Sequence, residues 1–352
     1  MYMNEQNRAG LPAELERAAS FRLDQEMYTL ARQRGENLTD YLEELDPSDP
    51  SGSLDAFERQ LAVAGIRVSG ANSDVIDRFF SSKESAVLFP EFVSRSVRAG
   101  MDDFKKLQRI VGTRTRIDSD TYKTVYMDDS VLSAEDLRLA RAGEGAALAK
   151  VELKSADHSI GIYKFGRYLE ASYEAIRRRK ASVVAIFLRA IGVQIQKDKF
   201  AAAIDVLIDG DGNSNAAAVQ DTAAAELAYD DLVTFSLAFD PYELNAMVVN
   251  QATAATLLAL TEFKDPSISQ DFQTRGKMVT PFGAELLIDE SVPEDTIVGL
   301  DRRFALEEVF ETAVLTDSEK LIRQQLEGTA ISEVSGFGKI INSATRVLNI
   351  TG

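Results

Sequence analysis

The spacing of hydrophobic and polar residues changes character several times along the chain. Between Ala13 and Arg34, apolar side chains recur at near-helical intervals, which predicts one amphipathic helix. A turn-rich break, DPSDPSGS at Asp46–Ser53, precedes a second short helix predicted over Leu54–Val63. Large apolar residues are few here, so we expect this region to be poorly stable alone and to lie along another part of a structure.

The next region passes from an extended and helical pattern to a strand pattern. AVLFPEFVSRSVRAGM, Ala86–Met101, predicts an extended segment, a proline and then a helix. From Thr113 to Tyr168, strand-like pieces alternate with glycine turns. TYKTVYM and AALAKVELKS fit a half-exposed hairpin, and HSIGIYKF fits a following strand. We interpret this region as a long protruding β arm.

A long helix is predicted from Ala171 to Leu207, a stretch without proline and with one glycine, Gly192. At ~1.5 Å per residue it would be ~55 Å long. Its middle, ASVVAIFLRAIGVQI, is apolar nearly all round but too short and too arginine-interrupted for a membrane span. We therefore expect burial on several sides. The basic run Arg177–Lys180 favours a solvated turn or salt bridges over a DNA contact.

The loop after this helix, DGDGNSN from Asp209, resembles a calcium loop at first sight. A calcium loop of the helix–loop–helix type needs glycine at its sixth position and glutamate at its twelfth. Ser214 and Gln220 occupy these positions. Gly210 and Gly212 instead suit the left-handed turn that ends a helix, so we predict helix termination here and no metal site.

Residues 226–315 have the pattern of a compact mixed α/β stretch. Helices are predicted for YDDLVTFSLAF and for Gln251–Phe263, and strands for AMVVN, GAELLIDE and DTIVGL. The tail, Leu306–Ile350, has the pattern of long alternating strands, with a short helix predicted at Asp317–Gln325 and a final strand in SATRVLNI. The whole chain is therefore predicted to be α+β.

Composition removes most kinds of catalytic site. Of 352 residues, 45% are hydrophobic and 27% charged, with no cysteine and one histidine, His158. Thiolate chemistry and multi-histidine metal sites are excluded, and neither GxSxG nor a phosphate-binding P-loop is present. Carboxylate or lysine chemistry stays open. The acidic pairs Asp230–Asp231 and Asp128–Asp129 fit helix caps or solvated turns better than catalysis. We predict no catalytic, cofactor-binding or metal residues.

Charge and hydropathy also limit partners and location. The net charge of −17 repels phosphate and argues against ordinary nucleic-acid binding. No run of 18 apolar residues is present, so no membrane partner is expected. The N-terminal stretch lacks the pattern of a secretory signal, which predicts the cytoplasm or a particle assembled there.

The order of these segments resembles the major capsid proteins of tailed bacteriophages, over about Ala86–Ile350. The resemblance rests on an ordered set of segments: LFPEFVSRSVRAGM, AGEGAALAKVELKS, the long helix running into LIDGDG, AYDDLVTFSLAFDPYELNAMVVNQATAATLLAL, TPFGAELLIDESVPEDTIVGLD and TDSEKLIRQQLEGTAISEVSGFGKIINSATRVLNI. It implies the capsid fold shared with herpesvirus shells and a structural, non-enzymatic shell protein.

The resemblance also implies a domain map. An N-terminal arm would take residues 1–85, the peripheral domain would begin at 86–112, and the extended β loop would take 113–167. Residues 168–219 would form the backbone helix with more of the peripheral domain, 220–304 the axial domain, and 305–352 the closing peripheral strands. The loop Phe263–Lys277 would approach the centre of each hexamer or pentamer.

The family further implies partners and processing. Copies would form hexamers and pentamers of an icosahedral shell around double-stranded DNA, with a portal protein, a scaffold and a cement protein as further partners. Packaged DNA would be held only by weak, non-specific contact. Some members lose an N-terminal segment during maturation; a retained arm would staple neighbouring subunits. Some crosslink a loop lysine to an asparagine. Lys123, Lys150 and Lys154 with Asn342 stand in suitable regions, but an ordinary surface lysine is the favoured interpretation of each.

Two other hypotheses stay open at this point. A bacterial nanocompartment shell of encapsulin type, holding an enzyme cargo, has a related fold, but the long N-terminal arm argues against it. A soluble α/β enzyme that uses acidic residues, with magnesium, is the third. A DNA-filled particle of large diameter would decide against the nanocompartment, and a monomer with a deep acidic pocket would favour the enzyme.

Overall fold

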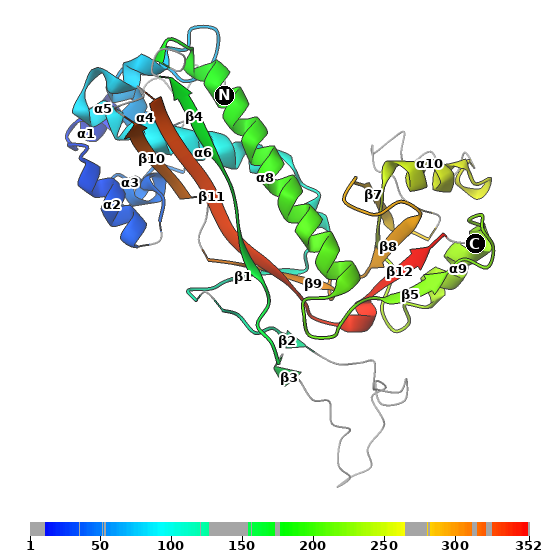
Figure 1. Cartoon of the computed structure of the whole chain (residues 1–352). Coiled ribbons are helices and arrows are strands. Elements are labelled where there is room, and N and C mark those ends of the chain that lie inside the picture. Colours follow the sequence, from blue (N-terminus) through cyan, green and yellow to red (C-terminus); the bar gives the residue numbers. More distant parts are fainter. Residues whose placement is uncertain are drawn as a thin grey trace. The chain divides into compact units, whose positions relative to one another are not determined.

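The computed structural model describes residues 11–34, 36–50, 52, 54–119, 121–126, 154–155, 157–172, 177–264, 280, 282–311, 315–321 and 326–350 (Figure 1). The chain divides into two compact units. The first unit comprises Met1–Asp103, Gly166–Ile195 and Thr312–Glu333, and the second comprises Phe104–Phe165, Gln196–Glu311 and Val334–Gly352. Both helices and strands are present, which confirms the predicted α+β class.

Four short helices open the first unit: α1 (Leu11–Ala19), α2 (Gln25–Gln33), α3 (Leu38–Leu45) and α4 (Ala56–Val63). The single helix predicted over Ala13–Arg34 is wrong, because the Ser20 hydroxyl donates to the carbonyl of Arg17 and α1 ends there. The predicted helix at Leu54–Val63 is confirmed. These helices pack against one another. The buried apolar residues of the helices and of the α1–α2 connection are Ala18, Leu23, Ala31, Leu38, Leu42, Ala56, Phe57 and Leu61.

Residues 76–103 are mostly helical, in 3₁₀ helix η2 (Ile76–Ser81), α5 (Lys83–Ala86) and α6 (Leu88–Asp103). The extended segment predicted before Pro90 is therefore wrong. Pro90 is the third residue of α6. Backbone N–H groups in the first turn of a helix have no intrahelical acceptor, so a proline, which lacks the N–H, removes no hydrogen bond there. Buried Phe79, Phe89 and Phe92 form an aromatic group that joins η2 to α6.

The long helix α8 covers Ala181–Asp209, 29 residues (Figure 1, green). Its predicted start at Ala171 is wrong, because strand β4 (Ile162–Ser172) occupies that position and pairs with the distant strand β11. Pairing with a partner remote in sequence overrode the local helical pattern. Within the first unit, a Cβ placed on Gly192 would collide with the Val97 carbonyl of α6, and one on Gly100 with the Arg189 carbonyl of α8. The two glycines thus permit close helix packing.

Strands β10 (Leu315–Leu321) and β11 (Leu326–Lys339) are antiparallel in the first unit, with Leu315 opposite Ser332. The short helix predicted at Asp317–Gln325 is wrong over 317–321, because the hairpin partner draws these residues into the sheet; residues 322–325 lie outside the described part. A pattern within one segment does not show which strand will pair with it, so cross-strand pairing can override a local helical preference.

The second unit contains two further strand groups. Strand β1 (Thr113–Arg116) pairs in parallel with β9 (Leu306–Phe310), and β9 pairs antiparallel with the last residues of β11. Strands β2 (Val125–Tyr126) and β3 (Lys154–Ser155) form an antiparallel pair, which confirms the predicted hairpin at these residues. The intervening residues 127–153 lie outside the described part.

A five-stranded sheet forms the main core of the second unit, in the order β5 (Ala218–Asp221), β12 (Thr345–Asn349), β8 (Thr296–Leu300), β6 (Ala246–Val249) and β7 (Glu285–Ile288). The strands predicted from AMVVN, GAELLIDE, DTIVGL and SATRVLNI are all confirmed. Every residue of β6 and β8 is buried, as their continuous apolar runs require.

Two helices supply the rest of this core, α9 (Tyr229–Leu237) and α10 (Gln251–Ala259). Both predicted helices are confirmed, although α10 ends before Phe263 and is followed by a short 3₁₀ turn, η4 (Glu262–Lys264). Phe235 and Phe239 are fully enclosed against Met247, Ile297 and Leu348. Two more 3₁₀ turns are η3 (Leu107–Arg109) and η5 (Asn342–Ala344). Over the described residues, no helix combines the length and apolarity needed to span a bilayer.

Candidate functional site

The acidic pair Asp230–Asp231 lies at the start of α9 and builds its first turn. The Asp231 carboxylate accepts hydrogen bonds from the backbone N–H groups of Ala223 at 3.1 Å and Ala228 at 3.0 Å. Asp231 is buried and Asp230 is exposed. Both carboxylates sit at the helix N-terminus, where negative charge is favoured, which confirms the predicted capping role. The other pair, Asp128–Asp129, lies outside the described residues.

The DGDGNSN loop ends α8, as predicted. Gly210, with φ +87°, and Gly212, with φ +94°, adopt the left-handed conformation, and the Gly210 N–H donates to the Val206 carbonyl at 3.0 Å. The buried Asp211 carboxylate accepts from the backbone N–H of Asn213 at 3.2 Å and of Lys339 at 3.0 Å. Its oxygens therefore join the helix end to strand β11. Within the described residues, no three metal-ligating side chains gather.

The remaining residues that the sequence singled out are scattered. His158 is exposed, and its backbone N–H donates to Asn213 Oδ1 at 2.9 Å. Lys123 Nζ donates to the Asp157 carbonyl at 2.9 Å, Lys154 lies in β3, and Asn342 begins η5. Lys150 and residues 265–277 of the predicted central loop lie outside the described part.

The basic run at Arg177–Lys180 lies immediately before α8. The Arg177 guanidinium is 3.7 Å from the Asp77 carboxylate and covers the Phe80 ring at 4.8 Å. Lys180 Nζ donates to the Ala71 carbonyl at 2.8 Å. These contacts confirm the predicted salt bridge and turn, and they attach the start of α8 to residues 71–80.

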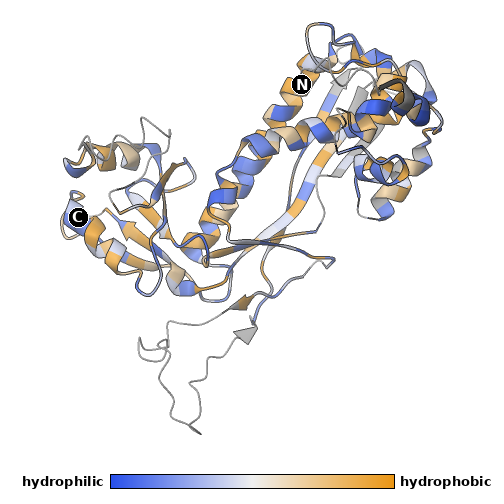
Figure 2. Cartoon of the chain, turned by 180° about the vertical axis from the view of Figure 1, so that it is seen from behind, coloured by the Kyte–Doolittle hydropathy of each residue, from blue (hydrophilic) through white to orange (hydrophobic). Residues whose placement is uncertain are grey.

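One face of α8 is both apolar and exposed. Val183, Ile186 and Phe187 stand at the i, i+3 and i+4 positions, and their exposed fractions are 42%, 66% and 66%. The opposite side is closed, since Ala181, Leu188 and Ile195 are almost fully buried. Figure 2 shows hydrophobic positions along the length of this helix. Burial on several sides was predicted, whereas the single chain buries only one side of these first turns.

This exposed apolar face is the strongest candidate for a binding surface. Single exposed apolar residues are ordinary, but adjacent ones on one helix face mark a contact with another molecule. The apolar-all-round sequence of α8 carried this signal, because such a helix must be covered on both sides. We call Val183, Ile186 and Phe187 the α8 apolar face.

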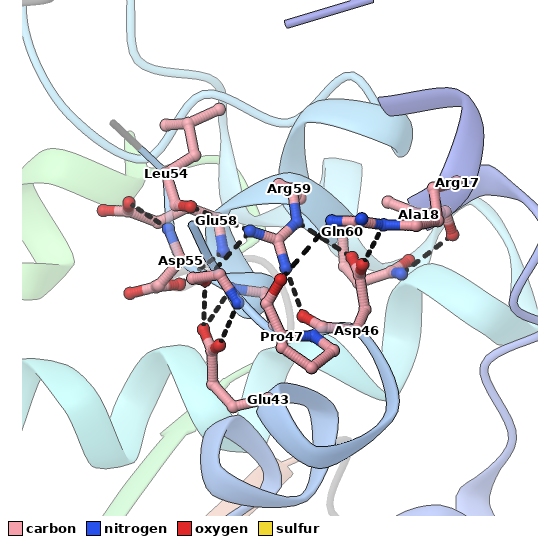
Figure 3. A network of polar contacts seen from close by, with 12 residues as sticks. Arg17, Ala18, Glu43, Asp46, Pro47, Leu54, Asp55, Glu58, Arg59 and Gln60 are labelled. Atoms are coloured by element: carbon pink, nitrogen blue, oxygen red, sulfur yellow. Dashed lines mark hydrogen bonds and ion pairs between the residues drawn. The ribbon is translucent and has the colours of Figure 1, made fainter. Parts of the chain in front are cut away.

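A buried polar network connects the N-terminal helices to one another (Figure 3). The fully buried Arg59 guanidinium donates to the Asp46 carboxylate at 2.9 Å, to Ser48 Oγ at 2.9 Å and to the Leu54 carbonyl at 2.9 Å; it also donates to the Asp46 carbonyl. Arg17 reaches the same carboxylate from the surface at 2.5 Å. Every partner is a structural group of this segment, so the network serves folding. The spacing of charges along the chain does not reveal burial, so the sequence gives no signal for this network.

The carboxylates of Glu91 and Asp301 have pKa values shifted in opposite directions. Burial raises the pKa of Glu91, and the hydrogen bonds and charges of Arg98, Thr39 and Arg95 offset this only in part. Burial also acts to raise the pKa of Asp301, but hydrogen bonds from Arg303, from the Glu243 and Arg303 N–H groups and from Asn245 prevail and lower it. Both carboxylates hold chain segments together and neither faces a described cavity of reactive groups.

Comparison with known proteins gives the family. A family model for phage capsid protein matches residues 157–347, which is more than half of the chain. No curated protein matches the sequence.

Solved structures with a similar fold include a virus-like particle and two particle capsids. A virus-like particle from Pyrococcus furiosus matches with a TM-score of 0.50 and 13% identity, over 74% of this chain and 98% of that one. The capsid of a native GTA particle matches with a TM-score of 0.53 and 15% identity, over 71% and 91% of the two chains. The capsid of an empty GTA particle matches with a TM-score of 0.52 and 16% identity, over 71% and 90%.

At these low sequence identities the similar structures establish only the fold, and the family model establishes the family to which the chain belongs. The expected capsid fold and the structural, non-enzymatic character are thereby confirmed, and self-assembly into a capsid shell follows from them. The chain belongs to the phage capsid protein family.

Proposed function

We propose that copies of this chain form the hexamers and pentamers of an icosahedral phage shell that encloses double-stranded DNA. The observation that carries the proposal is the α8 apolar face, on a chain of a shell-forming family. A neighbouring copy that covers Val183, Ile186 and Phe187 completes the burial that the helix sequence demands. Closed rings of identical subunits bury one such surface in every copy.

The rest of the proposed assembly follows the domain map. Residues 220–304 would form the axial domain around each ring centre, and 113–167 would extend as a loop over a neighbour. Portal, scaffold and cement proteins would be further partners, with assembly in the host cytoplasm. The charge of −17 supports only weak, non-specific contact with packaged DNA.

The first experiment expresses the full chain alone and examines it by negative-stain electron microscopy and mass measurement. Shells, rings or tubes are expected. The Ile186→Asp and Phe187→Asp double variant should lose them and stay a folded monomer, because two carboxylates on the α8 apolar face cannot be buried without partners. Lys197→Glu, which adds an acid to the exposed polar part of the same helix, should still assemble.

Each result has a consequence. Assembly of the double variant would remove the α8 apolar face from the subunit contacts. The wild-type chain could stay monomeric alone and assemble once a scaffold protein is added. That result would show that assembly requires contacts with the scaffold. Particles that contain protein cargo and no nucleic acid, when purified from infected cells, would favour the nanocompartment alternative.

A further inference from the structure

We propose that residues 11–72 form a clamp that stays bound to its own subunit through noncovalent packing, even when the chain is cut in the exposed turn Ser69–Asn72. We call residues 11–72 the N-terminal clamp. We also expect the clamp to remain in the assembled particle, and this expectation alone rests on the proposed function. The clamp itself does not. A clamp on its own subunit differs from the expected arm that would staple neighbouring subunits.

The N-terminal clamp carries its own interior. The Arg59–Asp46 ion pair is almost fully buried, and Gln60 Nε2 donates to the Ala18 carbonyl at 2.9 Å, which ties α4 to α1. Asp55 and Glu58 form a reciprocal capping box at the start of α4. Glu43 accepts from the Ala56 N–H at 2.7 Å and so joins α3 to α4. Bonds across α1, α3 and α4 give the segment a fixed shape.

The clamp holds α6 through one contact to a buried carboxylate and one partly exposed ion pair. Thr39 Oγ1 donates to Glu91 Oε1 at 2.8 Å, and the Glu91 side chain is 1% exposed. Arg95 donates to the Asp55 carboxylate at 2.5 Å, and its guanidinium covers the buried Phe57 ring at 5.0 Å. Release of the clamp would open Phe57 to water and take from Glu91 and Arg95 the partners they share with it. A charged group with a lost partner is costly, so retention is favoured.

The turn at Ser69–Asn72 lies between two anchored points. All four of its residues are exposed, and Gly70, at φ +80°, has nothing within 4 Å of an added Cβ. Arg67, before the turn, is hydrogen-bonded to Asp74, after it. The Asp74 N–H donates to the Arg67 carbonyl at 2.7 Å, and the Asp74 carboxylate accepts from the Arg67 N–H at 2.7 Å. Exposed turns with anchored ends are preferred sites of cleavage and of tolerated insertion.

The residues just beyond the turn are fixed to the start of α8. Ser73 and Ser182 hydroxyls are hydrogen-bonded at 2.7 Å, and the Ala181 N–H donates to the Asp74 carbonyl at 2.8 Å. The Ile76 N–H donates to the Arg179 carbonyl at 2.9 Å. A cut at 69–72 therefore leaves both new ends attached to folded structure.

The test inserts a specific protease recognition sequence between Gly70 and Ala71 of the full chain, cuts it, and separates the product by native size exclusion. Both fragments are expected to co-elute in equal amounts and to part only in denaturant. Elution of the N-terminal fragment by itself would overturn the proposal. Thr39→Ala with Arg95→Ala, cut in the same way, should release the fragment faster, and Arg22→Ala, at an exposed ion pair, should not.

Two further measurements cover other outcomes. If the insertion prevents folding, limited proteolysis of the unchanged chain replaces it: first cuts within 69–72 with co-elution support the clamp, and first cuts within α1–α4 contradict it. If tagged and untagged cut subunits exchange their N-terminal fragments on mixing, the clamp is not bound to its own subunit. None of these assays needs a shell, so failure of assembly and failure of the clamp are distinguishable. In purified particles, residues 11–72 should be present once per subunit.

Discussion

The N-terminal helices and the five-stranded sheet of the second unit reach stability by different means. The sheet buries large apolar side chains, with Phe235, Met247 and Ile297 fully enclosed. The N-terminal helices are short, and at their centre stands a buried guanidinium bound by one carboxylate and several carbonyl and hydroxyl oxygens. Apolar burial tolerates approximate shape, whereas a buried charge requires every partner in place. The two regions should therefore respond differently to substitution and to pH.

The largest effect is expected from Arg59→Ala. It leaves the Asp46 carboxylate, 3% exposed, without its buried partner, which should lower the free energy of unfolding by about 3–5 kcal/mol. Arg17→Ala removes the exposed partner of the same carboxylate, and it should cost no more than ~1 kcal/mol. Urea unfolding followed by helical circular dichroism measures both. Equal costs for the two variants would show that the charge network does not hold the helices together.

A smaller effect is expected from Gly192→Ala. Alanine normally stabilises a helix interior relative to glycine by about 1 kcal/mol, but here its methyl group would collide with the Val97 carbonyl of α6. We expect a net cost of about 1–3 kcal/mol, because backbone must move to make room. Ala190→Gly, at an exposed position of the same helix, should cost ~1 kcal/mol from propensity alone. A thermal shift upward for Gly192→Ala would contradict close packing of α6 on α8.

The smallest effect concerns pH and has opposite signs in the two units. The pKa of Asp301 is lowered, so its stabilisation is present at neutral pH and is lost as pH falls below about 4. The pKa of Glu91 is raised, so its contribution is complete below about 4 and is lost as pH rises through the folded value. From pH 7 to 4, wild type should gain stability relative to Glu91→Gln. Below pH 4 it should lose stability relative to Asp301→Asn. If the two differences in unfolding free energy changed in the same direction as pH falls, the predicted contrast between Glu91 and Asp301 would be wrong.

The local pattern of apolar, polar and glycine residues correctly predicted those elements whose conformation depends mainly on their own residues. The apolar runs at Ala246–Val249 and Thr296–Leu300 became fully buried strands, and the glycines after Asp209 ended the long helix. The order of segments was also sufficient for the capsid family resemblance. In each case the residues themselves favour the outcome: continuous apolar side chains require burial on both faces, and glycine adopts a positive φ without a steric penalty.

Tertiary contacts decided the rest. Pairing with β11 extended β4 into the predicted helix and turned residues 317–321 into a strand. The burial of Arg59, the close approach at Gly192 and the exposure of Ile186 and Phe187 depend on neighbours remote in sequence. The sequence by itself determined the class, the family and most elements, because period and propensity are local. Only the tertiary structure decided which charges are buried and which apolar face stays exposed, because both depend on what the fold places opposite.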